Sequence, residues 1–132
     1  MNYYFTTIAK GSFEDIETQL LALLKEEGFG VLTQIDIQKT LKAKLNVDFK
    51  KYKILGTCNP PFVYKALLAE DKIGTMLPCN IIVQEQEDNN IEVSAINPLI
   101  SMQVVNNETL KVVAQKVSNK LENVINNFKN EK

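Results

Sequence analysis

The feature that most constrains the fold of this chain is an apolar stripe near its C-terminus. From Asn107 onward, apolar side chains recur every three or four residues, the spacing that gathers them on one face of an α-helix. The stripe consists of Leu110, Val113, Val117, Leu121, Val124 and Phe128. A helix with one apolar face needs another element to cover that face. The segment therefore predicts a packed domain in which this helix lies on a sheet or on a second helix.

A second long helix of the same kind is predicted over residues 13–27. Ser12 and Asp15 have the spacing of a capping box at its start, and Gly28 suits the left-handed residue that ends many helices. Its apolar stripe consists of Phe13, Ile16, Leu20, Leu23 and Leu24. We expect the two stripes to share one core, in which the following residues are buried together: Leu20, Leu24, Val113, Val117 and Leu121.

Between the two long helices the sequence predicts strands separated by turn and helix signals. Strand-forming residues dominate five segments: residues 2–9, 29–35, 52–58, part of 75–86, and 91–96. Asp88-Asn89-Asn90 joins the last two strands as a hairpin.

Two short helices are also predicted. Asp36 caps one that carries Ile37, Leu41 and Leu45, and Asn59-Pro60-Pro61 begins one that runs to about Asp71. The pattern of residues 99–104 fits either a strand or a helical turn.

These elements predict a single α+β domain over residues 1–132. We expect about five strands in a mainly antiparallel sheet, with the two long helices on one face and short connecting helices elsewhere. Apolar strand residues such as Ile54, Ile82 and Val93 then need cover on one side or the other. One layer of helices leaves the second sheet face to the short helices, a ligand or a second subunit.

Charge and hydropathy narrow the class of protein. The net charge is −1 and the pI is about 5.5, which argues against a nucleic-acid partner because such binding depends on a basic field. No apolar run approaches the roughly 18 residues that span a bilayer, and the first residues lack the pattern of a signal peptide. We therefore expect a cytoplasmic protein without a membrane or nucleic-acid partner.

A set of short motifs along nearly the whole chain resembles the domain of unknown function 302 (DUF302) family. The motifs are Gly28-Phe29-Gly30-Val31-Leu32, Ile35-Asp36, Lys44-Leu45, Tyr52-Lys53-Ile54-Leu55-Gly56-Thr57-Cys58-Asn59-Pro60-Pro61, Ala66-Leu67, Ile73-Gly74 and Leu77-Pro78-Cys79-Asn80-Ile81-Ile82-Val83. The resemblance implies a small fold similar to the TATA-binding-protein-like superfold, often dimeric, and it implies no established reaction. Partly on this ground we expect a homodimer.

The residues that could carry chemistry are two Cys-Asn pairs. The chain has no histidine, which excludes a Ser-His-Asp triad and histidine acid–base catalysis. Cys58-Asn59 and Cys79-Asn80 each adjoin a proline at the end or start of a predicted strand, and Tyr64 follows the first pair. We expect both pairs to line one pocket. Cys58 precedes a helix start, where a thiolate would be stabilised.

Three functions fit these residues. The first is a non-enzymatic, dimeric module that binds a small molecule at Cys58, Asn59, Cys79, Asn80 and Tyr64. The second is a thiol-redox or soft-metal protein in which Cys58 and Cys79 react or bind the metal. Met76 and Met102 are further soft ligands for Cu(I) in that case, although methionine more often fills cores. The third is a structural or protein-interaction domain in which the motifs only shape the fold. The sequence identifies no cofactor, and it favours binding over catalysis.

Overall fold

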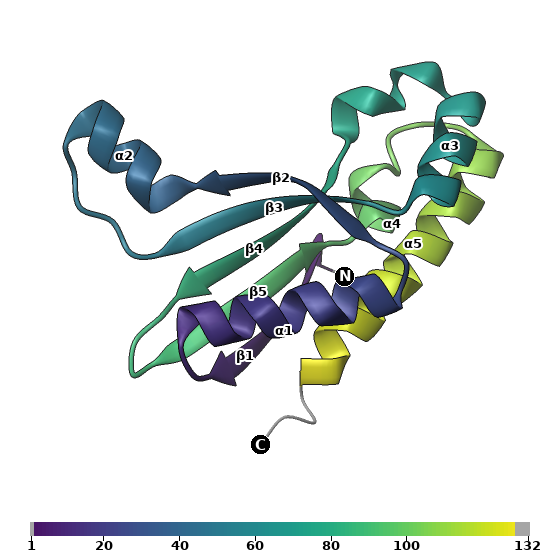
Figure 1. The fold of residues 1–132 in the computed structure, drawn as a ribbon. Coiled ribbons are helices and arrows are strands. Elements are labelled where there is room, and N and C mark those ends of the chain that lie inside the picture. The colour runs from purple at the N-terminus through teal and green to yellow at the C-terminus, as the bar shows by residue number, and fades with distance from the viewer. Residues whose placement is uncertain (1, 129–132) are drawn as a thin grey trace.

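The computed structural model describes residues 2–128, which form one sheet and its covering helices (Figure 1). The strands are β1 (Tyr4–Lys10), β2 (Gly30–Asp36), β3 (Tyr52–Cys58), β4 (Cys79–Glu85) and β5 (Asn90–Ile96). The helices are α1 (Phe13–Glu26), α2 (Ile37–Leu45), α3 (Pro60–Ala69), the 3-10 helix η1 (Asp71–Met76), α4 (Pro98–Ser101) and α5 (Glu108–Asn127).

The five strands form one sheet in the order β1-β5-β4-β3-β2. Every neighbouring pair is antiparallel, which confirms the predicted α+β class with its mainly antiparallel sheet. The hairpin between β4 and β5 has positive φ angles at Asp88 (60°) and Asn89 (59°), residues whose short polar side chains tolerate that conformation. Pro78 immediately precedes β4, so its missing N–H costs the sheet no hydrogen bond.

The helix ends follow the capping residues in the sequence. The Ser12 hydroxyl accepts a hydrogen bond from the Asp15 N–H at 3.0 Å, and Asn107 Oδ1 accepts one from the Leu110 N–H at 3.0 Å. Gly28 has a φ of +88° just after α1, a conformation that favours glycine. The helix predicted from Pro60 to about Asp71 is shorter than expected. It ends at Ala69, because Glu70 is extended, and η1 follows.

The core lies between the sheet and the layer formed by α1 and α5, which lie against the same face (Figure 1). The five residues predicted to share this core are all buried in one cluster: Leu20, Leu24, Val113, Val117 and Leu121. Of the apolar strand residues expected to need cover, Val93 lies in this core, whereas Ile54 and Ile82 lie on the opposite face and remain partly exposed.

The opposite face of the sheet carries no helical layer in the part of the chain that the structure describes. Alternation along the strands places Tyr52, Ile54, Ile82 and Ile96 on this open face. Residues 99–104, undecided from sequence, begin in the short helix α4. Among residues 2–128, no helix combines the length and apolar character that crossing a membrane requires.

Helix α2 and the strand ends that carry it stand away from the body of the domain as an arm (Figure 1). Its main packing partners are β2 and β3, and none of its residues is buried. Asp36 caps it as predicted, accepting a hydrogen bond from the Lys39 N–H at 3.0 Å, and Asn46 ends it with a φ of 54°. The stripe of Ile37, Leu41 and Leu45 thus forms a helix without entering the core.

Candidate functional site

The two Cys-Asn pairs meet at one end of the sheet. Cys58 is the last residue of β3 and Cys79 is the first of β4, and the antiparallel register pairs Thr57 with Cys79. Strand β5 ends beside them and continues through Asn97-Pro98 into α4. The ends of three strands and the starts of α3 and α4 therefore surround this region.

The register points the two thiols toward opposite faces. Cys79 shares the core face with its partner Thr57 and is buried, whereas Cys58 is the next residue after Thr57 and alternates to the open face. Asn80, opposite Gly56, also belongs to the open face and is exposed. The four residues therefore do not line one pocket as we expected from sequence, and the strand alternation does not favour a disulfide between Cys58 and Cys79.

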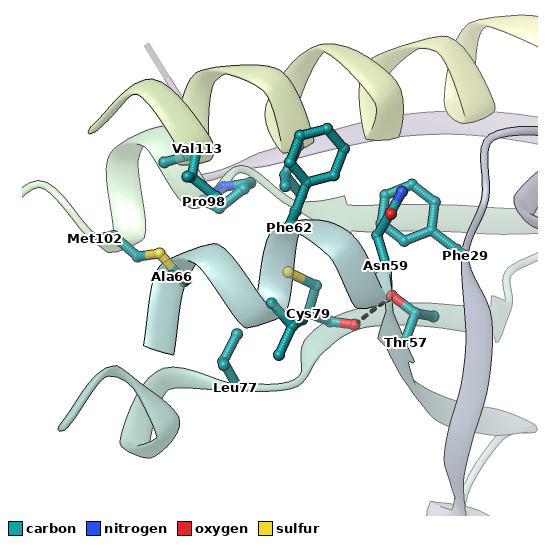
Figure 2. Close-up of a pocket in the computed structure, with 13 residues that line it drawn as sticks. Phe29, Thr57, Asn59, Phe62, Ala66, Leu77, Cys79, Pro98, Met102 and Val113 are labelled. Atoms are coloured by element: carbon teal, nitrogen blue, oxygen red, sulfur yellow. Dashed lines mark hydrogen bonds between the residues drawn. The ribbon is translucent and has the colours of Figure 1, made fainter. Parts of the chain in front are cut away.

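A small cavity beneath α3 holds the core-face members of the two pairs (Figure 2). Cys79 and Asn59 line it together with apolar side chains of the sheet, α3 and α5, among them Phe29, Phe62 and Val117. Its volume is about 20 Å³, room for roughly one water molecule. The Thr57 hydroxyl lines it too, but donates a hydrogen bond to the Cys79 carbonyl at 2.8 Å. The cavity as it stands is too small for an organic ligand.

Asn59 precedes α3 but does not cap it with its side chain. Its Nδ2 donates instead to the Glu27 carbonyl oxygen at 3.1 Å, joining the end of α1 to the start of α3. The N–H groups of Phe62 and Val63 both donate to the Asn59 carbonyl oxygen at 3.0 Å, so neither is available to an anion. Pro60 and Pro61 have no N–H group. The start of α3 is therefore not an anion cradle.

Both thiols hold their protons more tightly than ordinary cysteines. Burial raises the pKa of Cys58, and it raises the pKa of Cys79 to about 11, with the neighbouring Cys58 adding to the rise. The stabilised thiolate expected at Cys58 is absent, because the N–H groups at the start of α3 are directed at the Asn59 carbonyl. Neither cysteine has the electropositive setting of a reactive thiol.

The other residue predicted for the site lies elsewhere. Tyr64 on α3 is 67% exposed and lines neither the cavity nor the surface hollows around Asn80. Gly56, by contrast, is needed for close packing. A Cβ there would lie 2.7 Å from Pro78 Cγ and would also meet the Thr33 hydroxyl.

Asn80 borders two adjoining hollows, one at the end of the sheet and one on its open face. One is a groove of about 230 Å³ lined by Met76, Pro78, Cys79, Pro98, Ser101 and Met102. The other, of about 460 Å³, is lined by Tyr4, Tyr52, Ile82, Gln84 and Ser94. Asn80 and Ile96 line both, so we call the two together the open-face trough.

The trough combines an apolar floor with separate polar groups. Isoleucine, proline and methionine side chains alternate with phenol, amide and hydroxyl groups, the mixture that binds small molecules in proteins. Of its lining, the sequence prediction included Cys79 and Asn80 as ligand residues, and Met76 and Met102 as further soft ligands in the metal hypothesis. Gln84 and Ser94 were not predicted as ligand residues. The sequence signal that could have identified them is the period-two alternation of β4 and β5, which places them on the same face as Asn80.

A second Asn-Pro junction, interpreted from the sequence only as the end of the fifth strand, lies beside the first. Asn97 is 3% exposed, and its Oδ1 accepts hydrogen bonds from the Ser118 hydroxyl at 2.9 Å and the Leu99 N–H at 3.2 Å. The Asn97 N–H donates to the Tyr3 carbonyl at 2.7 Å. These bonds fix the entry of β1, the end of β5 and helix α5 relative to one another.

Comparison with known proteins agrees with this architecture. Residues 4–128 match the family described as "Domain of unknown function DUF302". The chain belongs to the DUF302 family. No curated protein matches it.

A solved structure is similar to this DUF302 chain over nearly its full length. The crystal structure of the uncharacterized conserved protein DUF302 from Bacillus stearothermophilus is 25% identical in sequence, with a TM-score of 0.87. The match covers 96% of this chain and 98% of that one. The shared fold supports the description of the sheet and its helices, and the relative is itself uncharacterized.

The ionisable groups of this DUF302 domain form pairs rather than metal-binding clusters. Within residues 2–128, no three cysteine or acidic side chains gather as a group that could hold a metal ion. The most enclosed ion pair joins Lys53 Nζ to Glu17 Oε2 at 3.1 Å, and beside it Lys51 binds Glu14 at 3.2 Å. These pairs tie the start of β3 and the residue before it to α1, on the face opposite the trough.

Proposed function

We propose that this DUF302 domain is a non-enzymatic binding module whose small-molecule site is the open-face trough. The observation that carries the proposal is the position of Asn80, which borders both hollows and offers an exposed amide over an apolar floor. The ligand class that fits is a small molecule with a flat apolar body and a group that hydrogen-bonds to an amide or a phenol. The high pKa of Cys79 supports binding rather than thiol catalysis.

A second copy of the chain completes this module. The open face presents Ile54, Ile82 and Ile96 only partly covered, and a symmetric partner would bury them and close the trough. Antiparallel sheets commonly pack face to face in this way, with nearly aligned strands. We therefore expect a homodimer, which light scattering at micromolar and higher concentration would detect by mass. A monomeric mass across that range would contradict the dimer.

The ligand site is tested with anilinonaphthalene sulfonate, a fluorescent probe with an apolar aromatic body. We expect saturable binding to the native protein and its loss in Asn80→Trp, whose indole would fill the trough. Asn123→Trp, an exposed position on α5 across the sheet from the trough, is the matched control and should bind the probe as the native protein does. Undiminished binding by Asn80→Trp would contradict a site at the trough.

A second candidate function is binding of a soft monovalent cation. It is favoured by the groove, because Met76, Cys79 and Met102 line it together and thiolate and thioether sulfur prefer Cu(I) over hard cations. The test is titration with Ag(I) in a Cys58→Ser background, which removes the thiol that does not line the groove. One bound ion that is lost on Met102→Leu would support this function, and retention of the ion would contradict it.

A further inference from the structure

Charge is divided unevenly between the arm and the rest of the molecule. Residues 37–50, which exclude the two lysines paired with α1, hold four lysines and one aspartate, a net charge of +3. Since the whole chain carries −1, the remainder carries −4. The net charge of the whole chain is close to zero because these two opposite charges nearly cancel. A molecule with separated opposite charges and little net charge associates readily with its own kind.

The arm also exposes apolar side chains that the body does not cover. Leu45 is 65% exposed, and Val47 and Phe49 in the loop after α2 are 42% and 41% exposed. The Phe49 ring packs against Tyr52, with 6.2 Å between ring centroids. Tyr52 belongs to the open face, so the apolar tip of the arm is continuous with the surface proposed above as the dimer interface.

A complementary surface lies at the same end of the sheet, on the β4–β5 hairpin. Residues 85–92 contain four carboxylates and no lysine. Glu85, Glu87 and Asp88 are exposed, and none of them forms an ion pair with another residue of the described range. On the arm, Lys39 and Lys44 likewise have no carboxylate partner among residues 2–128, and both are exposed.

The strand order brings these two surfaces together when two copies meet face to face. Strand β4 is the middle strand. Consider two copies stacked open face to open face and related by a two-fold axis that runs parallel to β4. Strands β2 and β3 of one copy then lie over β1 and β5 of the other. The end of the sheet that carries the arm lies over the same end of the partner sheet. The arm, carried by β2 and β3, then faces the partner's β4–β5 hairpin. By symmetry this contact occurs twice.

We propose that the α2 arm of each copy binds the acidic β4–β5 hairpin of a second copy, so that the dimer is held by reciprocal charge contacts at the edge of the open-face interface. The inference rests on the proposed homodimer but not on the trough ligand. A second copy fits better than a polyanion, because the arm's charge is balanced within the same chain and the molecule as a whole has no basic field.

The test is charge reversal followed by charge exchange. Lys39→Glu/Lys44→Glu should weaken the dimer by about tenfold or more, as measured by sedimentation equilibrium with folding checked by circular dichroism. Lys65→Glu/Lys116→Glu changes the net charge equally at exposed positions on α3 and α5 and should leave the dimer intact. Adding Glu85→Lys/Glu87→Lys to the arm reversal should restore the affinity, and added salt should weaken the native dimer.

Several results would overturn the arm contact. A dimer unaffected by the arm reversal would disprove it while leaving the open-face dimer standing. Failure of the exchanged variant to recover affinity would refute the pairing of arm with hairpin. A monomeric native protein whose arm lysines bind vesicles of anionic lipid would replace the second copy by a membrane surface. Probe binding at Asn80 is a separate readout, so failure of the ligand site is distinguishable from failure of the arm contact.

Discussion

The two Asn-Pro junctions of this domain share a sequence pattern but differ in how completely they are bonded. Asn59 and Asn97 each follow a strand, precede a proline that begins a helix, and are buried. At Asn97 the side-chain oxygen caps α4 and binds Ser118 of α5. At Asn59 the amide nitrogen reaches the end of α1, and the side chain makes no cap bond to α3.

The difference separates an asparagine side chain that ties several elements together from one that lines a cavity. Around Asn97 the bonds join the N-terminal segment, α4 and α5 into one unit. Asn59 lies instead beside the cavity that contains the Cys79 side chain. The same dipeptide therefore ties several segments together through the Asn97 side chain and lines a cavity through the Asn59 side chain. Four predictions test this contrast, beginning with the largest effect.

The largest effect is expected at α5, which serves both junctions through adjacent residues. Val117 is buried and lines the cavity near Asn59, and Ser118 binds Asn97. Val117→Asp should lower the free energy of unfolding by about 4 kcal/mol, because it buries an unpaired charge. Urea denaturation followed by circular dichroism measures the loss. Lys116→Asp, exposed on the same helix turn, is the control, and a Val117→Asp protein as stable as this control would show that the buried face of α5 is misassigned.

Removing the tied asparagine should cost nearly as much. Asn97→Ala leaves the buried Ser118 hydroxyl and the Leu99 N–H without their acceptor, and we expect a loss of about 3 kcal/mol. Thermal and urea unfolding measure it. The double variant Asn97→Ala/Ser118→Ala should lose less than the sum of the single variants, because the two share one hydrogen bond. Additive losses would contradict that coupling.

The thiol between the junctions predicts a pH dependence at high pH. Burial raises the pKa of Cys79 from the ordinary 9.0 to about 11 in the folded protein, so the folded state holds this proton more tightly than the unfolded state. The stabilisation is complete below pH 9 and is lost as the pH rises toward 11, a change of about 2 to 3 kcal/mol.

Comparison of variants isolates this contribution from the tyrosines and lysines that titrate in the same range. Urea denaturation at a series of pH values should show a shallower decline for Cys79→Ala than for the native protein. Cys58→Ser is the control and should decline almost as steeply as the native protein, since Cys58 is less buried. Equal slopes for native protein and Cys79→Ala would mean that the Cys79 thiol is not held in an apolar setting.

The smallest loss is expected at Asn59. Asn59→Ala removes the one side-chain hydrogen bond to the Glu27 carbonyl, and we expect it to cost about 1 kcal/mol. The same unfolding measurements give the value, with the exposed Asn123→Ala as the matched control for loss of an amide. A loss equal to that of Asn97→Ala would remove the distinction between the two asparagine side chains.

Much of this fold was predictable because it depends on local pattern. The predicted strand over residues 52–58 has the bounds of β3, and the stripe from Leu110 to Phe128 gives the buried face of α5. The facing of the two thiols was not predictable. It depends on the pairing of Thr57 with Cys79, and a shift of one residue would turn every side chain of a strand to the other face.

Two further features lay beyond local pattern. The stripe of Ile37, Leu41 and Leu45 predicted a helix, but period alone does not tell whether a helix meets the core or stands away from it as α2 does. Asn97-Pro98 looked like an ordinary strand end, because its main partner, Ser118, is 21 residues away in the sequence. Both features are set by tertiary contacts that a single sequence does not display.

The place of β1 in the sheet has a consequence for the order in which the chain can fold during its synthesis. Within the described residues, β1 is an edge strand that pairs only with β5. The residues of β5 follow 80 to 92 positions later, in the register from Lys10↔Asn90 to Tyr4↔Ile96. At a synthesis rate of about 5 to 20 residues per second, the first strand waits roughly 4 to 18 seconds for its partner. Until β5 emerges, β1 has no strand to join and the sheet has no native edge on that side. A nascent chain stopped before Asn90 would therefore expose an unpaired strand, and that is the stage at which we expect this protein to be most prone to aggregation.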